Sequence, residues 1–172
     1  MMKNKQGFTL IELVIVIVVL GILAVTALPR LLNLQSNART SALQGLKGAM
    51  QGANEQLIGL ASVENLNVLS SATLTIEGDD VAIVYGYPKA DNANAWSQLL
   101  ETTIEDATFG SDGADWYFSN TDPNDGVILY LPADRRQTAQ NCYLQYTEAT
   151  SSSEPSFSPV SYTHLTLPTK SS

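Results

Sequence analysis

One carboxylate near the N-terminus lies in a stretch that otherwise carries no charge. Residues 8–28 are uncharged except for Glu12. A carboxylate at the centre of a bilayer costs about 2.5–3.5 kcal/mol even on insertion scales, and charges inside membrane segments are usually paired and functional. If the chain were cut between Gly7 and Phe8, Phe8 would carry a new ammonium group. That group and Glu12 are four residues apart, a spacing that places them on one face of a helix.

The new ammonium group would meet either Glu12 of its own chain or Glu12 of a neighbouring copy. In the second arrangement the carboxylate sets the axial register between subunits, which is the best-attested use of a buried charge. Other chemistry has few residues available, because the chain has one cysteine, Cys142, and one histidine, His164. Most Cys/His metal sites are thereby excluded, and no hydrolase triad or phosphate-binding glycine loop is visible. The sequence therefore predicts no enzyme, no cofactor and no metal site.

The element that positions Glu12 is predicted to be a membrane-spanning helix over residues 8–30. A helix over residues 8–28 is roughly 31 Å long, which matches a hydrocarbon core of about 30 Å. Lys3 and Lys5 precede it, so the positive-inside rule places residues 1–6 in the cytoplasm and the rest across the membrane. A secretory signal peptide is one alternative, but its apolar core would be shorter. A plain anchor is the other alternative, and it leaves Glu12 unexplained.

The segment KNKQGFTLIELVIVIVVLGILAVTALP, residues 3–29, resembles the N-terminus of type IV pilins and of the related type II secretion pseudopilins. The resemblance implies that residues 1–7 are a leader, removed between Gly7 and Phe8 by a prepilin peptidase that also methylates Phe8. It further implies that Glu12 guides each subunit into the base of a filament built from identical or related subunits by a pilus assembly machinery. Gly21 and Pro29 also lie where many pilins have them.

A second helical segment is predicted to follow, and a domain over residues 31–159 contains it. Apolar residues recur at three- and four-residue steps over residues 31–61, which is typical of an amphipathic helix. Pro29 should kink or loosen the junction between the two helical halves, because it lacks an N–H group. Gly48 and Gly52 allow close backbone approach. Their spacing leaves open whether the helix packs there on its own sheet or on a neighbouring subunit.

The rest of the domain is predicted to consist of strands. Residues 72–77 and 81–85 are predicted to form a hairpin around a turn at 78–80. Residues 95–104 could form a short helix. Three more strands are expected at 115–119, 127–131 and 142–148, with a turn at 122–126. One long helix followed by grouped strands predicts an α+β fold in which the helix packs on an antiparallel β-sheet, and the resemblance implies the type IV pilin fold.

Two shorter segments resemble a subgroup of the pilins. Leu43–Ala49 (LQGLKGA) and Tyr85–Pro88 (YGYP) look like the mannose-sensitive haemagglutinin (MSHA) pilins. This resemblance implies a subunit of an extracellular pilus that serves surface attachment, haemagglutination and biofilm formation, with host or surface glycans as possible partners. A type II secretion pseudopilin is the nearest alternative. A membrane-anchored periplasmic carbohydrate-binding protein is the alternative from another class.

Other candidate sites have simpler explanations. The net charge of −8 with scattered basic residues argues against a nucleic-acid surface. A calcium loop at 122–125 lacks the late glutamate of an EF-type site, so a turn is preferred. The acid pairs at 79–80 and 105–106 are expected to be solvated. Trp96, Trp116 and Tyr117 could stack on a sugar, but a place in the core is more common for such aromatics.

The C-terminal end raises a separate question. Pilins of this kind commonly close a C-terminal loop with a disulfide, yet Cys142 has no second cysteine in this sequence. Val160–Thr169 resembles one reading frame of a transposon-type sequencing adapter. We therefore expect residues 160–172, including His164, to be a non-native tail that replaced the native end and its cysteine.

Overall fold

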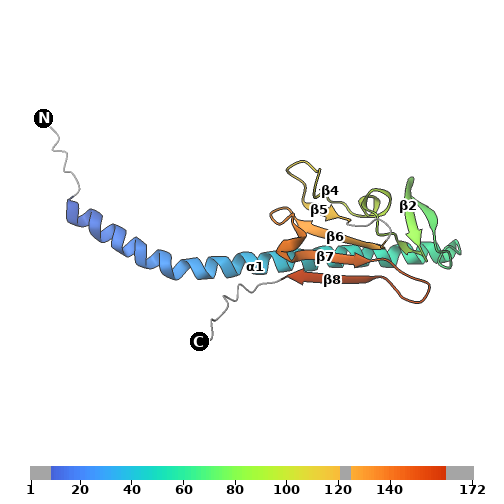
Figure 1. Ribbon diagram of the computed structural model, residues 1–172, viewed down its shortest axis with the longest axis horizontal. Helices are drawn as coiled ribbons and strands as arrows, with labels where there is room; N and C mark the ends of the chain where they lie inside the picture. The colour runs from blue at the N-terminus through green and yellow to red at the C-terminus, as the bar shows by residue number, and fades with distance from the viewer. Residues whose placement is uncertain (1–8, 121–124, 162–172) are drawn as a thin grey trace. The chain divides into compact units, whose positions relative to one another are not determined.

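The computed structural model describes residues 9–120 and 125–161, and within them the side chains of residues 28–33 are left out. The chain divides into two compact units, Met1–Arg39 and Thr40–Ser172. One element belongs to both units, the helix α1, which runs from Leu10 to Val63 (Figure 1). The predicted helical segments over 8–30 and 31–61 are therefore one element that ends within two residues of the expected position.

The first sheet has three antiparallel strands in the order β1-β2-β3. Its strands are β1 (Ala72–Ile76), β2 (Asp79–Val84) and β3 (Tyr87–Pro88). Glu77 and Gly78 join β1 to β2 with positive φ angles of 55° and 105°, the backbone that a tight hairpin turn with a right-handed strand twist requires. The predicted hairpin is confirmed, and β3 adds to it.

The second sheet has five strands in the order β4-β5-β6-β7-β8. These are β4 (Ile104–Asp106), β5 (Trp116–Ser119), β6 (Val127–Pro132), β7 (Cys142–Thr147) and β8 (Ser156–Ser161). The strands expected at 115–119, 127–131 and 142–148 are present. Where a single antiparallel sheet was expected, the structure has two sheets, and β4 pairs with β5 in parallel. The layout is an α+β fold, consistent with that of type IV pilins.

The helix expected over 95–104 is shorter and begins earlier. A π-helical turn, η1, covers Asn92–Trp96 and the short helix α2 covers Ser97–Leu99. The Asp91 carboxylate accepts the Asn94 N–H (3.1 Å) and so caps this turn. The turn begins at Asn92, three residues before the predicted start at residue 95. Ile104 is in β4, so the C-terminal part of that prediction was wrong.

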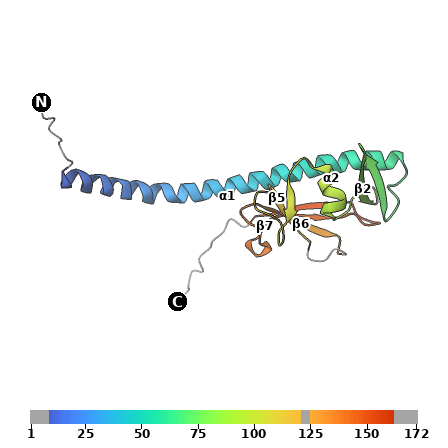
Figure 2. The same cartoon turned by 90° about the horizontal axis from the view of Figure 1, so that it is seen from above.

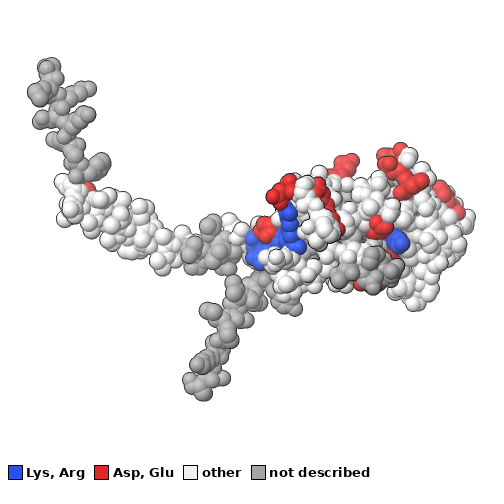
Figure 3. All heavy atoms as spheres, turned by 45° about the horizontal axis from the view of Figure 1, so that its top comes forward, with Lys and Arg blue, Asp and Glu red and all other residues white. Residues whose placement is uncertain are grey.

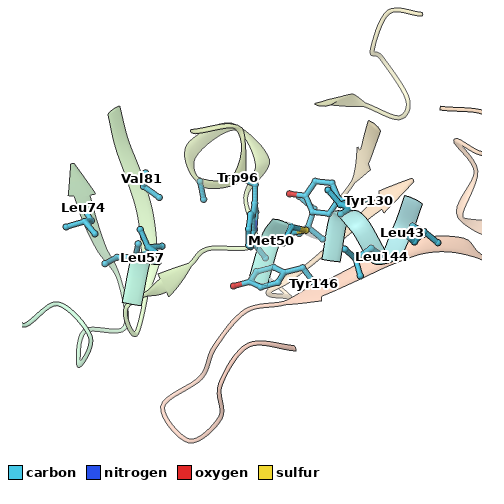
Figure 4. Close-up of a cluster of buried hydrophobic side chains, with 14 of the residues drawn as sticks. Leu43, Met50, Leu57, Leu74, Val81, Trp96, Tyr130, Leu144 and Tyr146 are labelled. Atoms are coloured by element: carbon cyan, nitrogen blue, oxygen red, sulfur yellow. The ribbon is translucent and has the colours of Figure 1, made fainter. Parts of the chain in front are cut away.

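The core of the second unit lies between α1 and the two sheets (Figures 1 and 2). Leu43, Met50 and Leu57 are completely buried on one face of α1 and contact side chains from both sheets (Figure 4). The Trp96 ring packs edge-on against Tyr146, with 4.8 Å between the ring centroids. The spacing of the apolar residues in 43–57 thus determines which face of the helix carries the domain.

Candidate functional site

The N-terminus of α1 is a capping box around Glu12. Thr9 donates two hydrogen bonds to Glu12 Oε2, one from its N–H and one from its hydroxyl, each 2.8 Å long. The Glu12 N–H in turn donates to Thr9 Oγ1 at 3.4 Å. These bonds satisfy backbone and side-chain donors that a helix end otherwise leaves open. Sequence reasoning missed this arrangement, although its signal, Thr9-x-x-Glu12 before an apolar run, is present in the chain.

The segment that follows the capping box is exposed along its whole length. The large apolar side chains from Leu10 to Val25 have exposed fractions between 42% at Val14 and 79% at Leu10. Residues Leu10–Ala27 are long and apolar enough to cross a membrane, judged by length and composition, and none of this window is buried. A buried core helix of a soluble protein is thereby excluded for these residues. So much exposed apolar surface needs lipid or another protein around it.

Several predicted site residues fall outside what the structure describes. Gly7 and Phe8 precede the described residues, so the cleavage site and the spacing of the new amine from Glu12 stay predictions. The backbone of α1 is helical through residue 29, but the ring of Pro29 is among the side chains left out, and the kink also stays a prediction. His164 likewise lies beyond residue 161.

Cys142 is the first residue of β7 and is buried. Its partner across the sheet is Ser161 of β8, and Val160 pairs with Tyr143. The start of the tail that we expect to be non-native thus overlaps the last two positions of β8. That Val160 and Ser161 are non-native residues stays a prediction.

Some candidates for sugar and calcium binding are core or turn residues, and others lie outside the described residues. Trp96 and Tyr117 have no exposed surface and Trp116 is half-buried, so the first two are core residues, the interpretation the sequence favoured. Asp122 and Asn124 lie outside the described residues. Asp125 accepts the Val127 N–H at 2.8 Å, which is a turn contact. No group of three or more metal-binding side chains occurs among the residues that are described.

Two acid pairs were expected to be solvated. One of them, Glu105–Asp106, instead makes hydrogen bonds that hold the following loop. The Asp106 carboxylate accepts the N–H groups of Thr108 (2.7 Å) and Phe109 (3.1 Å), and Glu105 accepts hydrogen bonds from Ser111. These bonds shape the loop that follows β4. The Asp79–Asp80 pair is exposed, as expected, and Asp80 accepts a bond from the Thr75 hydroxyl at 2.8 Å.

Gly45, Gly48 and Gly52 of α1 face away from the domain. A Cβ atom placed on Gly45, Gly48 or Gly52 would meet nothing within 4 Å. These glycines therefore do not serve to fit the helix against its own sheet, which removes one of the two explanations left open by the sequence. Leu43 and Leu46 in the same segment are buried, so LQGLKGA alternates a core face with a bare outer face.

The second subgroup segment, YGYP, forms the turn between β2 and β3. Tyr85 and Gly86 both have positive φ angles, 51° and 82°. A Cβ on Gly86 would lie 2.5 Å from Ile58 Cδ1 of α1 and 3.0 Å from the Asn67 Cα. The glycine is required there because the turn closes directly against the helix.

Comparison with known proteins adds a motif and three relatives. A family model described as "Prokaryotic N-terminal methylation motif" matches residues 2–28. Two fimbrial proteins of Pseudomonas aeruginosa are 36% identical over 72 residues, which is 42% of this chain and 44% of each relative. The fimbrial protein EcpC of Eikenella corrodens is 28% identical over 156 residues, or 81% of this chain and 96% of that protein. No solved structure matches.

The chain thus spans less than half the length of the two Pseudomonas relatives, whereas its similarity to EcpC extends over most of both chains. The motif covers the segment that contains Glu12 and the exposed apolar helix. It fits anchoring in a membrane before assembly into an extracellular pilus. Together, the methylation motif, the fimbrial relatives and the α+β layout support a type IV pilin, a structural fimbrial protein of a kind that is typically non-enzymatic.

Proposed function

We propose that this chain is a subunit of an MSHA-like pilus and that it polymerises through the N-terminal half of α1. The observation that carries the proposal is the exposed apolar run of Leu10–Ala27, which begins at a capping box containing the only acid of the run. The segments LQGLKGA and YGYP support the MSHA subgroup. The filament would serve surface attachment, haemagglutination and biofilm formation.

Processing creates the group that Glu12 needs. Cleavage between Gly7 and Phe8 gives Phe8 a new amine, which the same peptidase methylates, and the chain then starts one residue before the capping box. Both Thr9 bonds go to Glu12 Oε2, and we assign Oε1 to the Phe8 amine of a neighbouring subunit. An ammonium–carboxylate contact in surroundings of low dielectric is strong, so it can set the register of the incoming subunit.

Assembly transfers the apolar helix from one apolar environment to another. Before assembly, Leu10–Ala27 lies in the inner membrane with residues 1–6 on the cytoplasmic side. In the filament the same side chains pack against those of neighbouring helices. Each buried methylene contributes about 0.8 kcal/mol relative to exposure in water, so the extracted helix is stable only in the bundle.

The first test is the mass of the N-terminal peptide of chain recovered from membranes or sheared filaments. We expect a peptide that begins with a methylated Phe8. An intact Met1, or cleavage beyond Ala24, would contradict the proposal and favour an anchored or secreted domain. Glu12→Ala should abolish filaments while leaving the amount of membrane-bound protein unchanged. Glu55→Ala, an exposed acid on the same helix, is the matched control and should assemble normally.

The MSHA assignment has its own test. Sheared filaments should agglutinate red cells, and mannose should inhibit the agglutination. Filaments that form but do not agglutinate would leave the pilin proposal intact and remove the subgroup. Short assemblies that stay in the envelope would point to a type II secretion pseudopilin.

A further inference from the structure

Phe109, in the loop between β4 and β5, is the one aromatic side chain of the described residues that lies exposed. Its exposed fraction is 89%, whereas every other aromatic side chain in residues 9–120 and 125–161 is buried or half-buried. The ring is also isolated, because no other large hydrophobic side chain described between residues 70 and 161 is exposed. A single exposed apolar side chain is ordinary on a protein surface, so its surroundings decide what it can do.

The Phe109 ring is presented by a built turn. The Asp106 carboxylate accepts the Thr108 and Phe109 N–H groups at 2.7 and 3.1 Å. The Ser111 hydroxyl donates to Glu105 at 2.9 Å. These bonds hold the backbone on both sides of the ring. A ligand that covers the ring therefore loses little entropy in ordering the loop.

Asp112 of the same loop and Arg136 of the β6–β7 loop form a fixed polar pair. Nη2 of Arg136 donates to Asp112 Oδ1 at 2.6 Å and to the Tyr117 hydroxyl at 2.8 Å. The guanidinium lies 3.8 Å from the centroid of the Tyr117 ring, and this cation–π contact holds it in place. The Asp112 side chain is 95% exposed and that of Arg136 is 31% exposed. Asp112 Oδ2 accepts no hydrogen bond from the residues that the structure describes, so one carboxylate oxygen and part of a guanidinium are open to a ligand.

The ring and the polar pair can contact one small ligand. Phe109 and Asp112 are three residues apart, so their Cα atoms lie at most about 11 Å from each other, even in an extended chain. A flat apolar face with a few placed polar groups fits a sugar ring, which has an apolar C–H face and a rim of hydroxyl groups. A stable protein–protein contact buries about 800 Å² on each partner around an apolar centre. One isolated ring does not supply such a centre.

The charge around the ring favours a neutral sugar. Acidic residues outnumber basic ones in and next to the two loops, which hold Glu105, Asp106, Asp112, Asp115 and Asp134 against Arg135 and Arg136. Figure 3 shows acidic side chains directly beside the main group of basic ones. This excess of negative charge would repel a sugar that carries a carboxylate or a sulfate. A neutral hexose meets no such repulsion.

We infer that Phe109, Asp112 and Arg136 form a binding site for a neutral hexose of a surface glycan. The C–H face of the sugar stacks on the Phe109 ring, one hydroxyl donates to Asp112 Oδ2, and another accepts from the Arg136 guanidinium. The site is open, so a single copy binds weakly, and the repetition of copies along a filament raises the overall avidity. The inference rests on the proposed attachment function and adds the residues and the class of sugar.

Saturation-transfer NMR on the full chain, in a detergent without a sugar headgroup, tests the site directly. The probes are methyl α-mannoside and methyl α-glucoside, with N-acetylneuraminic acid as the charged sugar. We expect transfer to the neutral hexosides and none to the acid. Phe109→Ala should weaken the binding of the mannoside about tenfold, because the stacking face is lost, whereas Phe109→Trp should retain it. Val68→Ala, at an exposed apolar position outside the loop, is the matched control and should bind as the unsubstituted chain does.

The polar pair has its own variant. Asp112→Asn keeps the shape of the side chain but removes the charge of the acceptor. It should weaken the binding of the mannoside about two- to fivefold, the range of an exposed charged contact. Asp79→Asn, at an exposed acid of β2, is the control and should leave the binding unchanged.

The outcomes separate this inference from the proposed function. The site is overturned if the unsubstituted chain binds neither hexoside, or if Phe109→Ala binds the mannoside as well as the unsubstituted chain does. Both results hold whether or not filaments form. Equal binding of N-acetylneuraminic acid would overturn the choice of a neutral sugar. A chain that binds the mannoside but keeps an intact Met1 and forms no filaments would contradict the proposed pilus function and leave the site standing.

Discussion

The replacement of Gly86 by alanine tests how closely the YGYP turn approaches α1. Gly86 has a φ angle of 82°, and an added Cβ would lie 2.5 Å from Ile58 Cδ1 and 3.0 Å from the Asn67 Cα. The first neighbour is the end of a flexible side chain and can move. The second is backbone and cannot move without shifting the segment after α1.

The expected loss has two parts. The left-handed backbone costs an alanine about 1–2 kcal/mol, and forcing a methyl group into a filled space costs about 1–3 kcal/mol. Gly86→Ala should therefore lower the free energy of unfolding by about 2–5 kcal/mol. Gly78→Ala is the matched control, because Gly78 also has a positive φ angle, 105°, but has nothing within 4 Å of its added Cβ. It should lose only the backbone part, about 1–2 kcal/mol.

The assay is denaturant unfolding of the full chain in a mild detergent, followed by the fluorescence of the buried Trp96. Ile58→Val removes the nearest atom, so Gly86→Ala should cost less in the Ile58→Val background than in the unsubstituted chain. This difference is the coupling measured by a double-mutant cycle. Equal losses for Gly86→Ala and Gly78→Ala, or a larger loss in the valine background, would refute the close approach.

Three further predictions concern the core and three titrating groups. Burial raises the pKa of Tyr146 and of Tyr130. The stability that their neutral forms contribute is therefore complete below pH about 10 and is lost as the pH rises above it. Replacing either with phenylalanine should reduce the slope of the free energy of unfolding against pH in that range by about 1.4 kcal/mol per pH unit. Hydrogen bonds from Thr103 lower the pKa of Asp115, so the stability difference between the unsubstituted chain and Asp115→Asn should be constant above pH about 4 and shrink as the pH falls below it, in denaturant titrations at each pH. Leu57→Ala, at a completely buried position, should lower the free energy of unfolding by about 2–5 kcal/mol in the same assay. Leu60→Ala, at a position that is 40% exposed, should lower it much less.

Sequence periodicity predicted the elements whose stability comes from their own pattern. Helix α1 has a continuous apolar face from residue 43 to 57, and the β1–β2 hairpin has alternation around Glu77–Gly78. Strands β5, β6 and β7 have the aromatic and aliphatic residues that favour a pleated, half-buried surface. Each of these signals is local, so it was visible without the fold.

The missed elements depend on partners distant in the chain. Strand β8 contains serines and Pro159, and proline is confined to edge strands or bulges; its pairing comes from β7. Strand β4 has three residues, and its parallel pairing beside β5 is supported by bonds between Thr103 and Asp115. The turn at Asn92–Trp96 depends on the burial of Trp96 against Tyr146. None of these contacts leaves a periodic trace in the sequence.

The capping box clarifies why a carboxylate at the start of the apolar helix is tolerable before assembly. Two donors from Thr9 already satisfy Glu12 Oε2, so the side chain is partly compensated while it waits for a partner amine. Glutamine also serves in a capping box but carries no charge. Glu12→Gln should therefore keep the helix start, measured by amide exchange at residues 10–12 in detergent, and still lose filaments. If Glu12→Gln instead loses both the protection at those amides and the filaments, Glu12 acts only by starting the helix. The intersubunit ion pair would then be wrong.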